Sequence, residues 1–546
     1  MIMKLPPGIS DSVFNLAIKE FEQAVGKDWV FTSEADLDLY RDAYSPFKGE
    51  EEERVASAAV APDNVEAVQA VVRTANKYKI PIYPISTGKN LGYGGSAPTL
   101  SGSVVLDLKR MNRVLEVDEA NASCLVEPGV AYFDLYRHIQ EKGYKLWIDT
   151  PDPGWGSIIG NALDRGGGYT ATKYRNHFDA HCGMEVVLAN GEVMRTGMGA
   201  LPGAKTWQQY KSGFGPWIDG MFSQSNFGVV TKMGFWLMPQ PEGYLAGRVE
   251  VFKYEDLIPL VDIMSDLENN GIYTGMPMLD VPLINPSMLP GEAMRTPPPA
   301  EVQAILSKPG GPTAAELEAY CKQHDVGLWG CKFQYYGPEE IVRAQWAYTK
   351  KRLSVIAGAR FSEPEFYTMP LTPEQMQKVH KVSLGIPNLE MFFIGARSPS
   401  NPNPTRGHIW FSPIIPRNGR EVFKAQRVFS EASRQLGLPV FPLAIATTYW
   451  ERAFIFIFGF PITDDIEFNR KNREAFRELV KIAAANGWGE YRTAPAHQDA
   501  IMATYSFNNH ALLRFHETVK DAIDPNGIIS PGRYGIWPKN LRGNKV

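Results

Sequence analysis

Short apolar runs alternate with helical spacings along the first half of the chain. Apolar residues recur at helical spacing over 65–78, and a strand-like run follows directly at 80–85. Further strand-like runs lie at 103–108, 122–127, 184–189 and 227–237. One more helix is predicted at 134–142. Asn190-Gly191 directly after one of these runs is a hairpin signal, which predicts antiparallel pairing. The pattern therefore predicts an α+β fold rather than a purely parallel, doubly wound sheet.

The pattern of predicted elements changes after about residue 245. Pro/Gly-rich stretches at 286–299 and 308–312 separate longer helices, which we predict at 338–356 and 420–436. Strand-like runs also occur at 408–415 and 454–460. A chain of 546 residues exceeds the length at which a single hydrophobic core keeps growing. We therefore expect two domains.

Composition and charge exclude several classes of function. The net charge is −4 and the basic residues are scattered, which argues against a nucleic-acid partner. No run approaches the length of a membrane span, and the first residues lack a signal-peptide pattern, so cytoplasmic localisation is the expectation. Four scattered cysteines predict no disulfide framework, and no metal-ligand spacing links the histidines. We therefore expect no metal site and no membrane association.

A glycine-rich segment follows the predicted strand at 80–85. Between 86 and 95 it carries Ser86, Thr87, Gly88, Lys89, Asn90 and Gly92, followed by two more glycines. Glycine permits positive φ and close backbone approach, and successive amide groups can then form a concavity that binds anions. The segment is neither a dinucleotide fingerprint nor a P-loop. Because ligand-free glycine turns are common, the residues alone leave a pyrophosphate cradle and an ordinary turn equally open.

Other motifs accompany this segment in a distinctive order. They lie at 126–130, 154–161, 225–232 and 524–529, with a further characteristic span at 183–191. Together they resemble the vanillyl-alcohol oxidase and p-cresol methylhydroxylase family of FAD-dependent enzymes, over about 5–538. The resemblance implies a two-domain α+β fold of that type. An FAD-binding domain would comprise 1–245 and 486–546, and an inserted α+β cap domain for the substrate would comprise 246–485.

The resemblance also implies which residues contact the cofactor. The expected FAD-binding residues are Ser86, Thr87, Gly88, Lys89, Asn90, Gly92, Pro151, Gly156, Ser157, Asn161, Gly228, Val230 and Arg533. His408 lies in a His–x–x–Phe–Ser–Pro motif that is similar to the flavin-linking motif of the family's histidyl branch, so a covalent histidyl bond is expected. The p-cresol branch uses a tyrosine instead, and 389–394 contains none. Relatives with a second, assisting histidine draw it from the segment matching 44–55, which has none here.

Two aspartates compete for a place beside the flavin. Asp149 and Asp152 both lie in a Pro-rich turn, and an ordinary turn role explains either residue. In the alcohol-oxidising branch, the aspartate that matches Asp152 lies next to flavin N5, where a carboxylate can act as a base. Its spacing from Gly154 favours Asp152 over Asp149.

Tyr93, Tyr491 and Arg492 match two tyrosines and an arginine that bind the phenolic oxygen in the family, although packing alone could explain the tyrosines. Hydride leaves a benzylic carbon more readily when the para oxygen is phenolate, because a p-quinone methide then forms. Phenolic donors and a guanidinium stabilise that anion. Tyr169 is expected to line the same pocket. The segments 171–178 and 447–454 depart from the family pattern, which predicts a reshaped pocket.

The resemblance thus implies oxidation of a 4-substituted phenol by hydride transfer to flavin N5. Molecular oxygen is the expected acceptor, with hydrogen peroxide released. A c-type cytochrome subunit is the alternative, as in 4-alkylphenol dehydrogenases. An FAD oxidoreductase of 2-hydroxy acids or sugars and a non-catalytic flavoprotein also stay open. A homodimer or larger homo-oligomer is expected.

Overall fold

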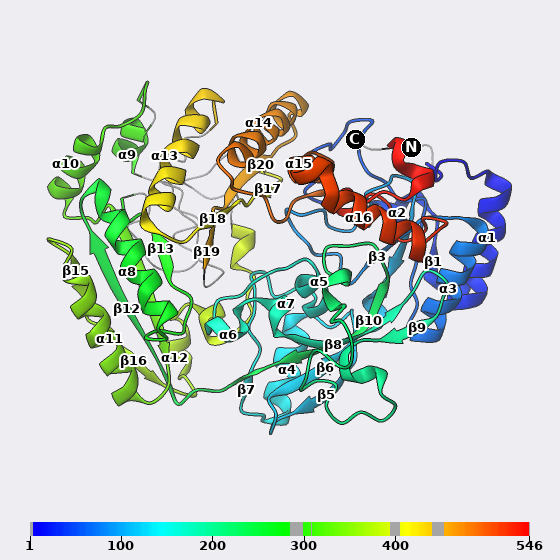
Figure 1. Cartoon of the computed structure of the whole chain (residues 1–546), viewed down its shortest axis with the longest axis horizontal. Helices are drawn as coiled ribbons and strands as arrows, with labels where there is room; N and C mark the ends of the chain where they lie inside the picture. The colour runs from blue at the N-terminus through cyan, green and yellow to red at the C-terminus, as the bar shows by residue number, and fades with distance from the viewer. Residues whose placement is uncertain (1–3, 284–298, 307, 394–404, 439–451, 545–546) are drawn as a thin grey trace.

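A computed structural model describes residues 4–283, 299–306, 308–393, 405–438 and 452–544, and Figure 1 shows the whole chain. A four-stranded sheet lies near the N-terminus, with strand order β1-β2-β4-β3. Its strands are β1 (Val30–Phe31), β2 (Ala58–Val60), β3 (Ile82–Ile85) and β4 (Val104–Asp107). β4 pairs in parallel with both β2 and β3, whereas β1 pairs antiparallel with β2.

Helices α1 (Asp11–Val25) and α3 (Val65–Tyr78) pack together beside this sheet (Figure 1). α3 has the predicted bounds because both of its ends are defined locally. The Asn64 side chain accepts a hydrogen bond from the Ala67 amide at 2.8 Å, which caps the first turn. Lys79 ends the helix in the left-handed conformation. The apolar face of α3 is fully buried with the sheet in one hydrophobic cluster.

A second sheet of five antiparallel strands has the order β5-β6-β10-β8-β9. Its strands are β5 (Val114–Asp118), β6 (Ser123–Val126), β8 (His181–Val187), β9 (Val193–Arg195) and β10 (Val229–Trp236). β8 and β9 form the antiparallel hairpin that Asn190-Gly191 predicted. Helices α4 (Tyr132–Lys142), α5 (Ile158–Leu163), α6 (Thr172–Arg175) and α7 (His177–Ala180) belong to the same stretch of chain. The α+β prediction is confirmed.

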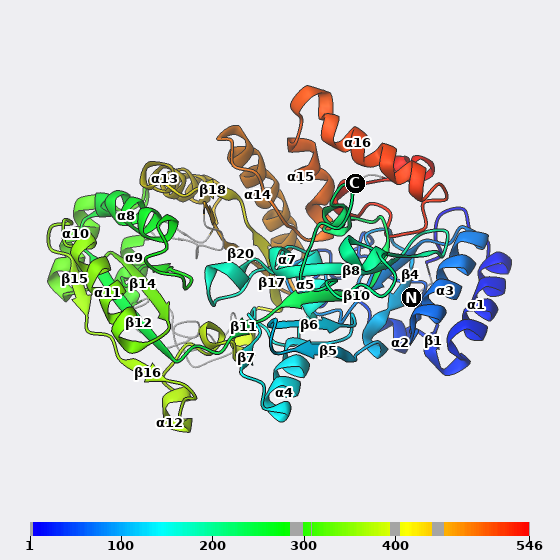
Figure 2. The same cartoon turned by 60° about the horizontal axis from the view of Figure 1, so that its bottom comes forward.

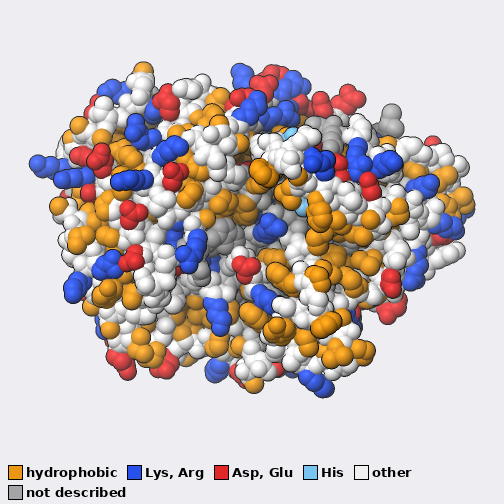
Figure 3. Space-filling view, viewed as in Figure 1, with side chains coloured by type: hydrophobic (Ala, Val, Ile, Leu, Met, Phe, Trp, Pro, Cys, Tyr) orange, Lys and Arg blue, Asp and Glu red, His pale blue; other side chains and the backbone are white. Residues whose placement is uncertain are grey.

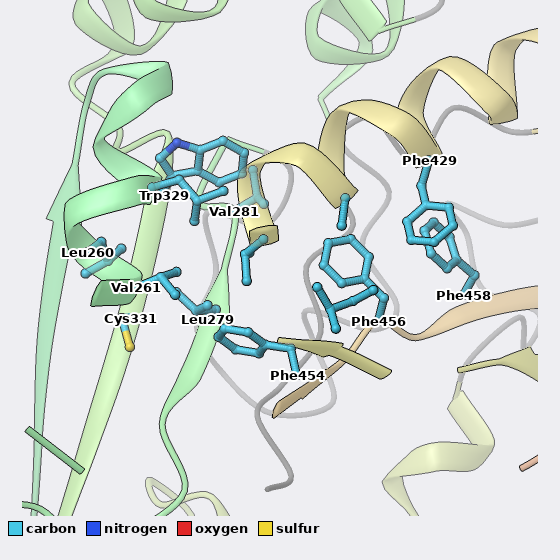
Figure 4. Packing of buried hydrophobic residues seen from close by; sticks show 14 of the residues in the cluster. Leu260, Val261, Leu279, Val281, Trp329, Cys331, Phe429, Phe454, Phe456 and Phe458 are labelled. Carbon is cyan, nitrogen blue, oxygen red and sulfur yellow. The ribbon is translucent and has the colours of Figure 1, made fainter. Parts of the chain in front are cut away.

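The other end of the molecule is built on a third sheet (Figure 1). β12 (Gly243–Val251) and β14 (Trp329–Tyr336) form its centre, flanked by β13 (Met278–Asp280), β15 (Arg360–Ser362) and β16 (Phe366–Thr368). Alternate residues of β14 are buried in a large cluster with helix α8 (Leu257–Asn269) and the aromatic residues around Phe456. Figure 4 shows how Trp329, Leu279 and Phe454 point into this core.

The strand-like runs predicted at 408–415 and 454–460 both contain strands, but each run is divided into two short strands. β17 (Gly407–Phe411) pairs with β20 (Phe458–Ile462), whereas β18 (Ile414–Pro416) pairs with β19 (Ala453–Ile455). Pro413 has no amide hydrogen to donate to a ladder. The Ser412 amide donates instead to both carboxylate oxygens of Glu490, at 2.7 and 2.8 Å. The break within 408–415 therefore follows from the Ser412-Pro413 dipeptide and from Glu490.

The remaining segments complete the two halves. They are α2 (Glu34–Asp38), β7 (Leu146–Trp147), β11 (Met238–Pro239), α9 (Ala300–Leu306), α10 (Ala314–His324), α11 (Glu339–Leu353), α12 (Pro373–Met376), α13 (Gly419–Gln435), α14 (Ile466–Ala485), α15 (Gln498–Thr504) and α16 (Phe507–Ile523). α16 returns the chain to the N-terminal half, as Figure 2 shows. There the Ile82 amide donates to the Ile528 carbonyl at 2.7 Å. The domain boundaries at 245 and 485 stay a prediction.

Charged residues are dispersed. Figure 3 shows acidic and basic side chains interspersed over one face. None of the helices in the described part of the chain combines the length and apolar composition needed to cross a bilayer.

Candidate active site

A cavity of about 390 Å³ opens between the glycine-rich segment after β3, the start of α5, the start of β10 and the turn at Arg533. Most of the predicted site residues share its lining, although they come from distant parts of the chain. They are Ser86, Thr87, Gly88, Lys89, Asn90, Tyr93, Pro151, Asp152, Gly156, Ser157, Asn161, Tyr169, Gly228, Val230, Tyr491, Arg492 and Arg533.

The glycine-rich segment has the backbone of an anion cradle. Gly88 has a φ of 67°, and a Cβ atom there would lie 2.2 Å from the Ser96 hydroxyl oxygen. Within the described ranges, the amides of Thr87, Gly88 and Lys89 have no protein acceptor within hydrogen-bond distance. Three neighbouring residues that line a cavity, and whose amides have no described protein acceptor, suit the pyrophosphate of a dinucleotide. The residues present therefore fit FAD.

α5 comes close to this cradle because a glycine lies at the contact. A Cβ atom at Gly160 would lie 2.4 Å from the Ser86 hydroxyl oxygen. Ser157 caps α5: its hydroxyl oxygen accepts from the Gly160 amide at 3.0 Å and donates to the Pro128 carbonyl at 2.6 Å. The cradle and α5 thus form one rigid wall of the cavity.

Tyr93, Tyr491 and Arg492, here called the Tyr–Tyr–Arg cluster, form the other end. The Arg492 guanidinium carbon lies 3.8 Å from the Tyr93 ring centroid and 5.5 Å from that of Tyr491. The Tyr93 hydroxyl lies 3.3 Å from the Ser412 hydroxyl. Burial raises the pKa of the Tyr93 phenol although Arg492 opposes the shift, so Tyr93 is a protonated donor at neutral pH. The cluster offers hydrogen-bond donors and a fixed positive charge.

The two candidate aspartates have different surroundings. Asp152 lines the cavity. The Asp149 carboxylate is 2% exposed and accepts from the amides of Tyr169 and Thr170, at 2.9 and 3.2 Å. A Cβ atom at Gly168 would collide with it at 2.2 Å. Asp149 therefore holds the loop that presents Tyr169, and Asp152 is the one of the two that lines the cavity.

His408 and Gly92 are placed next to the cavity rather than in its lining. The His408 ring packs against Tyr44 and Trp410, with centroids 5.2 and 4.2 Å away. Trp410 lines the cavity, two residues along β17, and Gly92 touches Trp410 so closely that a Cβ atom would lie 2.6 Å from its ring. Both ring nitrogens of His408 are buried without a described hydrogen-bond partner. Burial lowers its pKa to about 4, so the ring is neutral at pH 7.

Sequence reasoning missed other lining residues, among them Asp164, Gln224 and Trp410. It also missed Glu490, a buried carboxyl group beside the Tyr–Tyr–Arg cluster, whose pKa burial raises well above its ordinary value. Trp410 and Glu490 lie within or beside motifs whose other residues drew attention, whereas Asp164 and Gln224 have partners far away in the sequence. The segment 447–451, part of the divergent stretch 447–454, lies outside the described residues.

Comparison with known proteins agrees with this geometry. Residues 56–197 match a family model described as an FAD binding domain. The chain is 33% identical, over 97% of its length and 97% of the relative, to the flavoprotein subunit of 4-cresol dehydrogenase (hydroxylating) from Pseudomonas putida. Its fold is similar to that of 4-ethylphenol oxidase from Gulosibacter chungangensis in complex with isoeugenol. That match has a TM-score of 0.84 and 35% identity and covers 99% and 100% of the two chains.

A further solved structure, p-cresol methylhydroxylase with substrate bound, matches with a TM-score of 0.83 and 32% identity over 98% and 99% of the chains. The likeness thus extends over both halves of the molecule, and the cavity residues fit the cofactor that this likeness implies. The chain is an FAD-dependent oxidoreductase and belongs to the vanillyl-alcohol oxidase and p-cresol methylhydroxylase family.

Proposed function

We propose that the protein oxidises para-substituted phenols at the benzylic carbon. The single observation that carries this proposal is the Tyr–Tyr–Arg cluster at one end of the cavity, where Arg492 lies 3.8 Å from the Tyr93 ring centroid. The names of the relatives, 4-cresol dehydrogenase and 4-ethylphenol oxidase, support the same substrate class. A 2-hydroxy acid or a sugar has no phenolic oxygen for such a cluster to bind.

The residues act on the phenolic oxygen. Tyr93 and Tyr491 donate hydrogen bonds to it, and the Arg492 guanidinium stabilises its negative charge. The phenolate then supplies electron density to the para position, which favours loss of hydride from the benzylic carbon and gives a p-quinone methide. Asp152 is the carboxylate placed to activate water or a substrate hydroxyl in the next step. FAD, when bound, supplies the two-electron acceptor for this oxidation.

Molecular oxygen is the acceptor that we favour, with hydrogen peroxide as the product. His408 is the proposed site of a covalent bond to the flavin, because a neutral, buried imidazole without a described partner keeps its lone pair available as a nucleophile. A c-type cytochrome subunit is the competing acceptor. A homo-oligomeric assembly is also proposed, by analogy with the family alone.

One experiment tests substrate, acceptor and covalent bond together. The visible spectrum of the purified protein is recorded before and after acid precipitation, then after anaerobic addition of 4-ethylphenol, and finally in air. We expect flavin in the pellet, bleaching by the phenol, and recovery in air with peroxide formed. An unbleached flavin across a panel of 4-alkylphenols contradicts the proposed substrate class. Flavin in the supernatant would show that no covalent bond to His408 forms. Slow recovery of the flavin spectrum in air would favour a cytochrome as the electron acceptor.

A further inference from the structure

Asp164 connects two parts of the cofactor wall. It follows α5 and is 4% exposed. One carboxylate oxygen accepts from the Asn90 side-chain amide at 2.6 Å, in the glycine-rich segment. The other accepts from the Arg533 guanidinium at 3.0 Å and from the Tyr534 hydroxyl, in the C-terminal turn. A single carboxylate therefore fixes two segments that are separated by more than 400 residues in the sequence.

The backbone carbonyl of Asp164 contacts the Tyr–Tyr–Arg cluster and Gln224. It accepts from the Arg492 guanidinium at 3.5 Å and from the Gln224 side-chain amide at 3.5 Å. The same Gln224 amide group donates to the Tyr491 carbonyl at 2.9 Å. Gln224 thereby bridges the turn after α5 and the segment that carries both Tyr491 and Arg492.

The backbone of Gln224 is itself held in an unusual conformation. Its φ is 46°, in the left-handed region that a residue with a side chain rarely adopts. Its amide donates to the Leu163 carbonyl at 2.7 Å, one residue before Asp164. Residues kept in such conformations concentrate at functional sites, where the surrounding structure compensates the strain. The conformation allows the Gln224 side chain to contact Asp164 and Tyr491 together.

We propose that Asp164 and Gln224 are positioning residues that join the cofactor end of the cavity to the Tyr–Tyr–Arg cluster. Neither residue carries out chemistry. Asp164 sets the distance between the glycine-rich segment and Arg533. Gln224 holds the segment that carries Tyr491 and Arg492 in a fixed position relative to Asp164. The inference rests on the proposed function only for the identity of the ligand that the cluster binds.

The first test replaces the Gln224 side chain with one of similar length and no hydrogen-bond donors. In the Gln224→Met holoenzyme we expect unchanged flavin content per chain. The dissociation constant of 4-bromophenol, which has no benzylic carbon and is followed by the shift of the flavin spectrum, should rise about tenfold for the loss of one good hydrogen bond. Gln209→Met is the matched control, because Gln209 is a half-buried glutamine outside the cavity lining, and it should bind as the wild type does. Binding by Gln224→Met within twofold of the wild type overturns the proposal.

The second test addresses the carboxylate. Asp164→Asn removes the negative charge opposite Arg533, so we expect both lower flavin content per chain and weaker 4-bromophenol binding. Flavin content is measured on denatured protein, which makes the readout independent of activity and of any covalent bond. If the wild type binds no phenol at all, the proposed substrate class fails, and the flavin content of Asp164→Asn still decides the role of Asp164. Wild-type flavin content in Asp164→Asn contradicts that role.

The double variant tests whether the two residues act as one unit. Residues in one hydrogen-bond network give non-additive effects. Each single variant raises the dissociation constant of 4-bromophenol by a certain factor. We expect the factor for the double variant to be at least threefold smaller than the product of the two single factors. Simple multiplication of the two effects would show that the residues act independently and would overturn the proposed coupling.

Discussion

The two ends of the cavity bind their ligands with different parts of the chain. The cofactor end relies on the backbone: Thr87, Gly88 and Lys89 line the cavity, their amides have no described protein acceptor, and glycines allow the walls to approach. The Tyr–Tyr–Arg end relies on side chains, with a guanidinium packed on a phenol ring. Ligand binding at the cofactor end is therefore most sensitive to added atoms, whereas binding at the Tyr–Tyr–Arg end is most sensitive to loss of charge.

The largest effect is expected at the side-chain end. Arg492→Met removes the positive charge beside the phenolic oxygen and should lower kcat/KM for 4-ethylphenol by roughly 10²- to 10³-fold, as for a lost oxyanion donor. Steady-state kinetics on protein with full flavin content measure the loss. Arg492→Lys keeps the charge without the planar fork and should recover only part of the activity. Wild-type kcat/KM in Arg492→Met would refute the assignment of this end.

The next effect is expected at the backbone end. In Gly88→Ala, the new methyl group would meet the Ser96 hydroxyl at 2.2 Å, and φ of 67° adds about 1–2 kcal/mol of backbone strain. Because the collision with Ser96 displaces the backbone that faces the cofactor, we expect FAD binding to weaken about tenfold, which corresponds to about 1.4 kcal/mol. Flavin content after dialysis measures it in the His408→Ala background, where no covalent bond to His408 retains the flavin.

A matched control separates strain from collision at the cofactor end. Gly143→Ala has a similar φ of 71° with open space around the methyl group, and it lies outside the cavity lining. It should retain FAD while losing stability only through strain. Equal flavin loss in both alanine variants would show that backbone strain, rather than the shape of the cradle, controls binding.

A smaller effect is expected at His408, which lies beside the cavity between the two ends. His408→Ala should release the flavin into the supernatant after acid precipitation, and turnover should fall because an unlinked flavin is a weaker oxidant. The holoenzyme should still bind 4-bromophenol with near wild-type affinity, because the Tyr–Tyr–Arg cluster proposed to bind the phenolic oxygen is unchanged. Flavin that stays in the pellet of His408→Ala would place the covalent bond at another residue.

The smallest effect on the cavity is expected at a buried histidine that does not line it. His497 is 1% exposed, and burial together with two nearby arginines lowers its pKa from 6.5 to about 3. Below pH 6.5 the unfolded chain binds a proton at this residue that the folded chain does not. The contribution to stability is therefore intact above pH 6.5 and is lost as pH falls towards 3, by about 1.4 kcal/mol per pH unit.

Urea unfolding at pH 7 and pH 5 measures this dependence. His497→Gln should reduce the difference in unfolding free energy between the two pH values by about 2 kcal/mol. An unchanged pH dependence would mean that His497 takes up its proton in the folded protein as easily as in the unfolded one.

Much of the fold was predictable because its signals are local. The helix at 65–78 has its cap, its apolar face and its end within the segment, and it matches α3 in both bounds. Pro413 is a local signal for the break within 408–415. The partner of the Ser412 amide, Glu490, could not be predicted, because it lies 78 residues away. The covalent bond at His408 and the roles of the site residues stay predictions.

Site residues that lie in recognisable sequence motifs were predictable, and those outside such motifs were not. Glycines and the Tyr-Arg pair form recognisable strings, so most of the cavity lining was expected. Asp164 lies in an ordinary helix-to-turn sequence, and its partners Asn90 and Arg533 are 74 and 369 residues away. Only the folded topology brings these residues together.

The pairing of β3 with the C-terminal segment has a consequence for how the protein is made. The Ile82 amide donates to Ile528, and the Ser530 amide donates back to Ile82 at 2.8 Å, just before Arg533 reaches the cavity. During translation, the first sheet leaves the ribosome long before this last stretch does. The lining of the cavity is therefore incomplete until the segment that carries Ser530 and Arg533 has been synthesised, so the complete flavin site forms only after that segment has emerged.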